Sequence, residues 1–346
     1  MRKTHFISLM LLACLLVTFN MLSLAQDDDV TATPGPSKTP DATIAEPTAV
    51  AESATESVSE TSEFGELPRS YTQQDLNVLV GNVQRPNGIV YYDDFLWTAC
   101  NGDWTLYRID AVTGETITFV FGVRDSHQLI AEETEIGFNL WIPDFGTDQL
   151  VRLDQSASSP QLITSDNLDG PWGIVEYGET DFLISNLRSN NIVLADRNGN
   201  TNIVLEDLRA PAGMATDGEV VFVANNSSAR RAIEWFAIDN LEISEDNIEV
   251  AEDITQPLVS GIQNASGIVL ADDGYLYFNY ALGTNGVVGR VNPTECMDGG
   301  CGNEDVEIVL LTDLTAPLAG LTITPEMRLF VHTIYRPELY WVDLYE

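Results

Sequence analysis

The sequence contains very few basic residues. Of its 346 residues, 16 are Lys or Arg and 53 are Asp or Glu, which gives a formal net charge of −37. Phosphate backbones and anionic lipid headgroups would repel such a chain, so nucleic-acid and membrane-surface binding are excluded as functions. The acidic surface is interpreted as a solubilising one, and a surface that collects divalent cations is the alternative.

Histidine and known catalytic motifs are also scarce. Beyond the first residues the histidines are His127 and His332. No GxSxG, HExxH, P-loop or dinucleotide-binding fingerprint occurs. We therefore assign no catalytic residue, and a lone histidine such as His127 is interpreted first as a hydrogen-bonded structural residue.

Long apolar runs are missing beyond residue 24. Arg2 and Lys3 precede an apolar run, and small residues stand before Gln26, so residues 1–25 are predicted to be a signal peptide. The protein is then secreted or held at the cell surface, and lipid anchoring at Cys14 is the alternative. No later segment has the roughly 18 apolar residues that a membrane-spanning helix needs, so no transmembrane segment is expected in the mature chain.

Aromatic residues are absent before Phe64 in the segment that follows the signal. Residues 26–69 are rich in Thr, Ala, Ser, Glu, Asp and Pro. A segment with so little to bury is predicted to be a disordered linker. It serves either as a stalk for the folded domain or as an inert spacer, and composition does not separate the two.

Cysteine is rare, and two of the cysteines are close in sequence. Cys296 and Cys301 lie in ECMDGGCG, where two glycines let the chain fold back, and exported proteins retain disulfides. We predict a disulfide between them; a zinc site is the alternative, but two thiols supply too few ligands. Cys100 ends an apolar run and is expected to be buried.

A degenerate motif returns along the rest of the chain. Copies of P-x-G-I occur as PNGI, PWGI, PAGM, ASGI and LAGL. The interval between the first two copies is twice the usual one, and SHQLIAEETEIGFNLWIPDF fills it as a degenerate copy with His127 in the x position. Six repeats are therefore predicted.

Each repeat contains short runs of β-branched and aromatic residues bounded by Gly, Asp and Asn, without helical periodicity. A run such as FLWTACN follows each motif, a third run ends in a sequence such as YRID, and a further strand such as DLNVLV precedes the motif. Six units of four strands predict an all-β fold, a six-bladed β-propeller of four-stranded antiparallel blades, over residues 70–346. The segment ELYWVDLYE completes the sixth blade.

The repeated small and polar residues have structural interpretations. The glycine after x is expected to allow the turn from the innermost to the second strand, where inner strands crowd the axis. The Asp or Asn that ends the run YRID and its equivalents is expected to accept hydrogen bonds from the turn backbone. These residues are Asp110, Asp154, Asp196, Asp239, Asn292 and Asp343.

Two columns of side chains are expected at one face of the ring: the x residues, and the residues that end the next strand 13 to 17 positions later. A central mouth with an aromatic wall and convergent polar groups is typical of a small-ligand pocket. We predict ligand binding by Asn87, His127, Asp144, Trp172, Asn186 and Asn225. The alternative is that these side chains satisfy loop backbone and water around a plugged channel.

The opposite face carries the two longest insertions, residues 240–261 and 293–305. An acidic segment and a disulfide-tied loop could together form a rim that binds a partner. Tolerated growth of the surface is the alternative interpretation.

The pattern P-x-G-I, LW, RID and TG resembles NHL-type and TolB-like six-bladed propellers over most of residues 75–346. LWTACNGDWTLYRIDAVTGE is similar to the repeats of virginiamycin B lyase-like proteins, and the pattern also resembles the gluconolactonase and regucalcin family. The gluconolactonase resemblance implies a divalent metal held by Glu, Asn and Asp. Asn87 matches, but Trp172, Ala212, Ser266 and Ala319 offer no strong ligand. The lyase resemblance implies His and Glu acting with magnesium, and no matching residues are assigned.

These observations predict an exported, non-catalytic, monomeric propeller that binds a small molecule, a sugar or an extracellular protein. No metal ligand or cofactor is assigned, and Ca²⁺ or Mg²⁺ is the candidate if one is required. A metal-assisted lyase or lactonase is the alternative.

Overall fold

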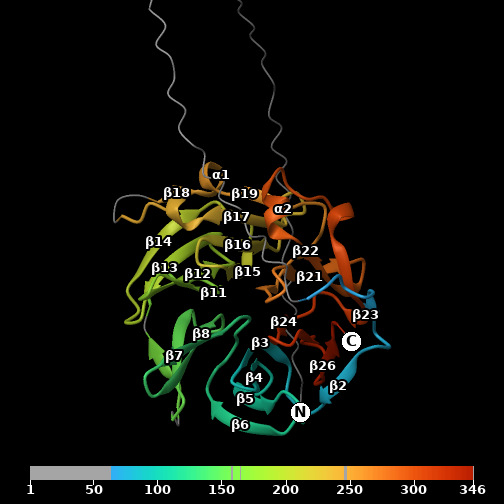
Figure 1. Cartoon of the computed structure of the whole chain (residues 1–346). Coiled ribbons are helices and arrows are strands. Elements are labelled where there is room, and N and C mark those ends of the chain that lie inside the picture. The colour runs from blue at the N-terminus through green and yellow to red at the C-terminus, as the bar shows by residue number, and fades with distance from the viewer. Residues whose placement is uncertain (1–63, 157–158, 164, 245–247, 346) are drawn as a thin grey trace, which may run out of the picture. The chain divides into compact units, whose positions relative to one another are not determined.

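Six β-sheets surround a common axis in the computed structural model, which describes residues 64–156, 159–163, 165–244 and 248–345 (Figure 1). Each sheet contains four antiparallel strands, and two of the sheets add a short parallel strand; this confirms the predicted six-bladed propeller. The predicted signal peptide and most of the predicted linker lie outside the described residues. Among the residues that the structure describes, no helix has the length and apolar character needed to cross a membrane.

The first three blades follow one another along the chain, and in each the first strand lies innermost. Blade 1 contains β3 (Pro86–Tyr92), β4 (Phe95–Cys100), β5 (Thr105–Asp110) and β6 (Thr116–Phe121). Blade 2 contains β7 (Ile130–Thr134), β8 (Gly137–Asp144), β9 (Gln149–Asp154) and β10 (Gln161–Ile163). Blade 3 contains β11 (Pro171–Tyr177), β12 (Asp181–Asn186), β13 (Asn191–Asp196) and β14 (Thr201–Glu206).

The last three blades repeat this order with longer connections. Blade 4 contains β15 (Pro211–Thr216), β16 (Val220–Asn225), β17 (Ile233–Ala237) and β19 (Gln256–Val259). Blade 5 contains β20 (Ile268–Leu270), β21 (Leu276–Leu282), β22 (Asn285–Val291) and β23 (Glu307–Thr315). Blade 6 contains β24 (Gly320–Ile323), β25 (Arg328–His332), β26 (Leu339–Asp343) and, from the start of the domain, β2 (Asn77–Val80).

The ring is closed by strands from the two ends of the domain. β2 pairs antiparallel with β26, with Val78 opposite Tyr340 and Val80 opposite Leu339. The order of the runs in the sequence groups each outer strand with the motif that follows it. In the structure the outer strand belongs to the preceding blade, and this offset leaves β2 to complete blade 6.

The hydrophobic core is divided among the junctions between blades. Six clusters occur in the described residues, each formed by two neighbouring blades. At the junction of blades 1 and 2, for example, the rings of Trp97 and Phe138 are 5.3 Å apart. Because each blade buries its faces against its neighbours, the closed ring is the stable unit.

The insertions and one N-terminal strand cover the outer edges of three consecutive blades. β18 (Glu249–Val250) pairs parallel with β14, and β1 (Tyr71–Thr72) pairs parallel with β23. In blade 4, Val259 forms a bridge with Cys301, which is disulfide-bonded to Cys296. An uncovered strand edge can pair with another chain, so these additions protect the edges of blades 3 to 5.

The short helices lie in the same insertions, both of which connect the third strand of a blade to its fourth. η1 (Ile238–Asn240) and α1 (Ala251–Ile254) belong to blade 4, and α2 (Pro293–Met297) and η2 (Asn303–Asp305) belong to blade 5. Asn292 caps α2 by accepting hydrogen bonds from the backbone of Thr294 and Glu295. Asp110 accepts the turn backbone in the same manner at the end of β5, as the sequence suggested.

Ordered packing begins before residue 70. Leu67, in the described part of the predicted linker, is only 9% exposed and packs with Tyr71 in the cluster between blades 5 and 6. The Tyr71 hydroxyl donates to the carbonyl oxygen of Leu344, at 2.9 Å. The segment before β2 is therefore attached to the last strand of the ring.

Candidate functional site

The x residues and the strand-end residues lie at one end of the ring, which we call the motif end. Pro86 at the start of β3 is paired with Cys100, and Pro171 at the start of β11 is paired with Asn186. The ladder shifts register between Pro171 and Ile174, which places Trp172 in a bulge.

The motif glycines are required by contact between blades. A Cβ atom on Gly173 would lie 2.4 Å from the carbonyl oxygen of Ala212, and one on Gly213 would lie 2.3 Å from that of Ser266. In each case the contact is with the x residue of the next blade. The expected crowding at the axis is therefore present, but the glycine lies at the start of the innermost strand and makes no turn into the second strand.

His127 and Trp172 close the channel at the motif end. Their rings stack at 3.4 Å between centroids with an interplanar angle of 7°, and Phe145 meets both rings edge-on. They line a void of about 20 Å³, which is close to the size of a single water molecule. The predicted central mouth is thus filled by its own aromatic wall.

The stacked histidine is neutral near pH 7, because burial lowers its pKa to about 3. Its Nε2 atom is 3.9 Å from the nearer carboxylate oxygen of Asp125. Burial raises the pKa of Asp125, while the side-chain amides of Asn87 and Asn101, which donate hydrogen bonds to it, oppose that shift. Asn87 is 1% exposed, and its amide oxygen has no hydrogen-bond partner in the described residues.

The three strand-end residues hold the loops that enter each blade. Asp144 accepts hydrogen bonds from the backbone of Arg124, Asp125 and Gly146. Burial raises its pKa, and these N–H groups oppose the shift.

Asn186 and Asn225 repeat this arrangement in blades 3 and 4. They accept hydrogen bonds from the backbone of Asp169 and Arg209, at 3.1 and 3.2 Å, and both side chains are fully buried. These contacts match the alternative interpretation, that such side chains satisfy loop backbone. Ligand binding by them stays a prediction.

Gln128 divides the channel. It occupies the place that glycine has in the other five copies, and its side chain reaches across the axis to blades 3 and 4. Its amide nitrogen donates to the carbonyl oxygens of Ile174 and Met214, at 3.2 and 2.7 Å, and its amide oxygen accepts from the backbone nitrogen of Met214 at 3.0 Å.

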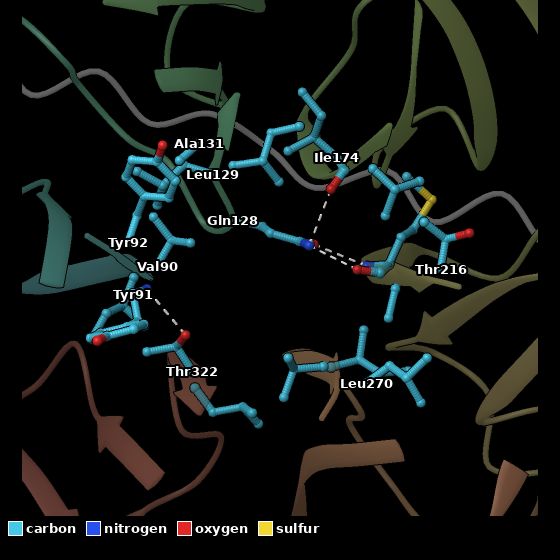
Figure 2. A pocket seen from close by; sticks show the side chains of 18 of the residues that line it. Val90, Tyr91, Tyr92, Gln128, Leu129, Ala131, Ile174, Thr216, Leu270 and Thr322 are labelled. Carbon is cyan, nitrogen blue, oxygen red and sulfur yellow. Dashed lines mark hydrogen bonds between the residues drawn. The ribbon is translucent and has the colours of Figure 1, made fainter. Parts of the chain in front are cut away.

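Beyond Gln128 the channel widens into a cavity of about 370 Å³, which we call the axial cavity (Figure 2). All six innermost strands contribute to it. Its inner wall is aliphatic and includes Ile89, Leu129, Ile174, Met214, Ile268 and Leu321. Its outer part includes Tyr91, Tyr92, Glu176, Thr216, Leu270 and Thr322. A mostly apolar cavity of this size with a few polar groups is typical of a small-molecule site.

The axial cavity opens at the opposite end of the ring, which we call the hairpin end. The inner rim of this end consists of the six turns between the first and second strands of each blade, at residues 93–94, 135–136, 178–180, 217–219, 271–275 and 324–327. The sequence pattern did not predict this cavity, because the x residues and the strand-end residues all lie at the motif end. One signal was visible, since Gln128 replaces the motif glycine and interrupts the column.

The residues at the motif end do not fit a divalent metal of the kind that the gluconolactonase resemblance implies. In the described part of the chain, no group of three His, Cys, Asp or Glu side chains could hold a metal ion. Asn87 donates through its amide to Asp125, and Trp172 is stacked on His127. A hard cation needs several converging oxygens, and the motif end does not provide them, so we assign no metal-dependent step to it.

Comparison with known proteins establishes the fold. No protein-family model and no curated protein sequence matches the chain. A streptogramin B lyase structure has a TM-score of 0.54 at 16% identity, covering 77% of this chain and 96% of that one. A gluconolactonase from Xanthomonas campestris has a TM-score of 0.59 at 14% identity, covering 78% and 89%.

A catalytically inactive virginiamycin B lyase from Staphylococcus aureus, solved with quinupristin, has a TM-score of 0.51 at 14% identity, covering 75% of this chain and 81% of that one. The chain is therefore similar to these propellers in fold, as its motifs suggested. At such identities the likeness shows a shared fold and does not show a shared activity.

Proposed function

We propose that this protein binds a small molecule with a largely apolar body in the axial cavity, without transforming it. The observation that carries this proposal is the cavity itself, about 370 Å³ in volume, floored by Gln128 and walled by aliphatic side chains from six strands. Burial of an apolar ligand there would remove hydrophobic surface from water on both sides.

The composition of the wall supports binding over catalysis. Among the residues that line the cavity, Glu176 supplies the carboxylate. In the described residues, no base or nucleophile is hydrogen-bonded to it. Acid–base and nucleophilic catalysis need such partners within hydrogen-bonding reach. His127, the histidine of the motif end, lies on the other side of the Gln128 floor.

The experiment is a ligand screen by thermal shift, followed by calorimetry on the compounds that stabilise the protein. Ala131 lines the cavity and lies at its wall in Figure 2, so Ala131→Trp should fill the space and abolish binding. Ile136 is 95% exposed in the turn that follows the same strand, so Ile136→Trp adds the same ring outside the cavity and should leave affinity unchanged.

Two results would overturn the proposal. One is equal affinity in the Ala131→Trp variant. The other is turnover of lactones or cyclic esters with added Mg²⁺ or Ca²⁺ that is lost in His127→Ala, which would favour the lyase or lactonase alternative and place the chemistry at the motif end.

We further propose that the binding domain acts outside the cytoplasm, as the N-terminal sequence suggests. Expression of the full chain in a bacterial host with an active export pathway, followed by N-terminal sequencing of the mature protein, tests this proposal. A new N-terminus near Gln26 supports secretion, a lipid-modified Cys14 supports anchoring, and an unprocessed cytoplasmic chain contradicts both.

A further inference from the structure

The hairpin end of the ring is uniformly acidic. Each of its six turns carries at least one Asp or Glu, and none carries Lys, Arg or His. The acidic residues of these turns are Asp93, Asp94, Glu135, Glu179, Asp217, Glu219, Asp272, Asp273 and Glu326. The turns surround the mouth of the axial cavity, because the cavity lining extends to the last residues of β3, β15 and β20.

Most arginines near this end are paired with carboxylates, whereas Arg108 and Arg152 lie over the rings of Phe95 and Trp141. Arg290 lies 3.1 Å from Asp273, Arg197 pairs with Glu132, and Arg328 pairs with Asp343 at 2.7 Å. Of these carboxylates, Asp273 alone belongs to a turn. The remaining turn carboxylates therefore give the mouth an excess of negative charge.

The motif end has a different balance. Its loops carry both signs of charge: the arginines are Arg85, Arg124, Arg188, Arg209, Arg230, Arg231 and Arg336, and the carboxylates are Asp103, Asp125, Asp148, Asp166, Asp169, Asp207 and Glu338. The charge of the domain is thus uneven along the axis, and the negative excess lies at the end where the cavity opens. A mouth lined by one sign of charge with apolar walls focuses the field and concentrates ligands of the opposite sign.

Glu176 and two tyrosines bring this charge to the cavity wall. Glu176 is exposed and lines the cavity, as do Tyr91 and Tyr92 (Figure 2). Burial raises the pKa of both tyrosines, and nearby carboxylates raise it further: Asp94 and Glu326 for Tyr91, Glu133 and Asp93 for Tyr92. The phenol rings are therefore uncharged at neutral pH and surrounded by negative charge.

We infer that the axial cavity takes an organic cation, with an amine or quaternary ammonium group at the mouth and an apolar body against the aliphatic wall. This inference rests on the proposed function and adds the class of ligand. Glu176 supplies the countercharge, and the faces of Tyr91 and Tyr92 can attract a cation through their quadrupoles. An anion of the same shape would have to enter against the field of the turns, without a basic side chain in the lining to receive it.

The test compares three probes with one apolar body: 4-phenylbutylamine, 4-phenylbutan-1-ol and 4-phenylbutyrate, each titrated by calorimetry. We expect the amine to bind about tenfold more tightly than the alcohol, and the carboxylate to bind more weakly than both. The advantage of the amine should shrink between about 10 mM and about 1 M salt, because screening shortens the range of the field.

Two variants locate the effect. Glu176→Gln should remove most of the advantage of the amine while leaving the alcohol unchanged. Glu206→Gln makes the same change at an exposed residue at the end of the outer strand of the same blade, outside the cavity lining, and should alter neither affinity.

The outcomes separate this inference from the proposed function. If the alcohol binds and loses affinity in Ala131→Trp, but the amine has no advantage or the carboxylate binds best, the cavity remains a binding site and the inference about charge is wrong. If none of the three shows saturable binding up to about 10 mM, or Ala131→Trp leaves all three unaffected, both are overturned. Binding of poly-lysine without binding of the free amine would indicate a basic protein partner and also overturn the inference.

Discussion

The side-chain amide nitrogen of Gln128 in blade 2 donates a 2.7 Å hydrogen bond to the carbonyl oxygen of Met214 in blade 4. The amide oxygen of the same side chain accepts from the backbone nitrogen of Met214 at 3.0 Å. β15 is the innermost strand of its sheet, so no other strand pairs with the backbone groups along its inner edge. One side chain thus completes the backbone hydrogen bonding of a distant strand and forms the floor of the axial cavity.

Replacing Gln128 by glycine, the residue of the other copies, should destabilise the protein. The change leaves backbone groups of Met214 and Ile174 without partners, and we expect a loss of about 1–3 kcal/mol in the free energy of unfolding. Urea denaturation measures it, with Gln74→Ala, at an exposed residue, as the control. Equal stability of Gln128→Gly and wild type would show that water replaces the side chain without cost.

Closure of the ring should depend on the inward-facing side of β26. Leu339 is fully buried, and Leu339→Asp places a charge in the core, so we expect a loss of more than about 3 kcal/mol in the free energy of unfolding. Val78, on the partner strand β2, is 57% exposed, and Val78→Asp should change this quantity by less than about 0.5 kcal/mol. Chemical denaturation compares the two, and similar losses would contradict the observed register of closure.

His127 should make the protein less stable in acid. Its pKa is about 3 in the folded state against an ordinary 6.5, so between these values the unfolded chain binds a proton that the folded chain does not. Its contribution to stability therefore falls as the pH drops through this window, by up to about 1.4 kcal/mol per pH unit. His127→Phe, which retains an aromatic ring against Trp172, should flatten the dependence of unfolding free energy on pH from 6.5 to 4.

Other buried titratable groups also affect the pH dependence of stability and must be separated from His127. The raised pKa values of Asp125 and Asp144 act with the opposite sign, but both residues are present in wild type and variant. Buried His332 also has a pKa of about 3, so His332→Phe in addition should flatten the profile further. An unchanged slope in His127→Phe would mean that the histidine ring accepts a proton within the folded protein.

Asn186 should contribute to the stability of the fold and not to ligand binding. Asn186→Ala removes the contacts to the backbone of Asn167 and Asp169, and we expect a loss of about 1–3 kcal/mol in the free energy of unfolding. Asn202→Ala, at an exposed strand position, is the matched control. Affinity for an axial ligand should be unchanged in both. A fall in affinity without a fall in stability would restore the predicted role of Asn186 in binding.

The six-bladed ring can be predicted from the sequence, whereas the axial cavity cannot. Alternating apolar residues and six motif copies predict strands and their number, because each blade obeys the same local rules. The side-by-side position of Asn186 and Pro171 also follows from the repeat. The stack of His127 on Trp172 does not, because it depends on the distance between two neighbouring blades and on side-chain rotamers.

The strands that cover the outer edges of the blades could not be predicted from the sequence either. β18 and β1 are two-residue strands without a pattern of their own, and each pairs with a strand from another part of the chain. Their positions follow from tertiary packing, here from the burial of residues such as Tyr71 and Ala251. Short strands held by distant contacts leave no periodic signal in the sequence.

The pairing of β2 with β26 also sets the order of events during synthesis. β2 leaves the ribosome before any blade is made, whereas Leu339–Asp343 emerges after every other strand. β2 therefore has no partner strand until translation has passed Asp343, and only then can the ring close.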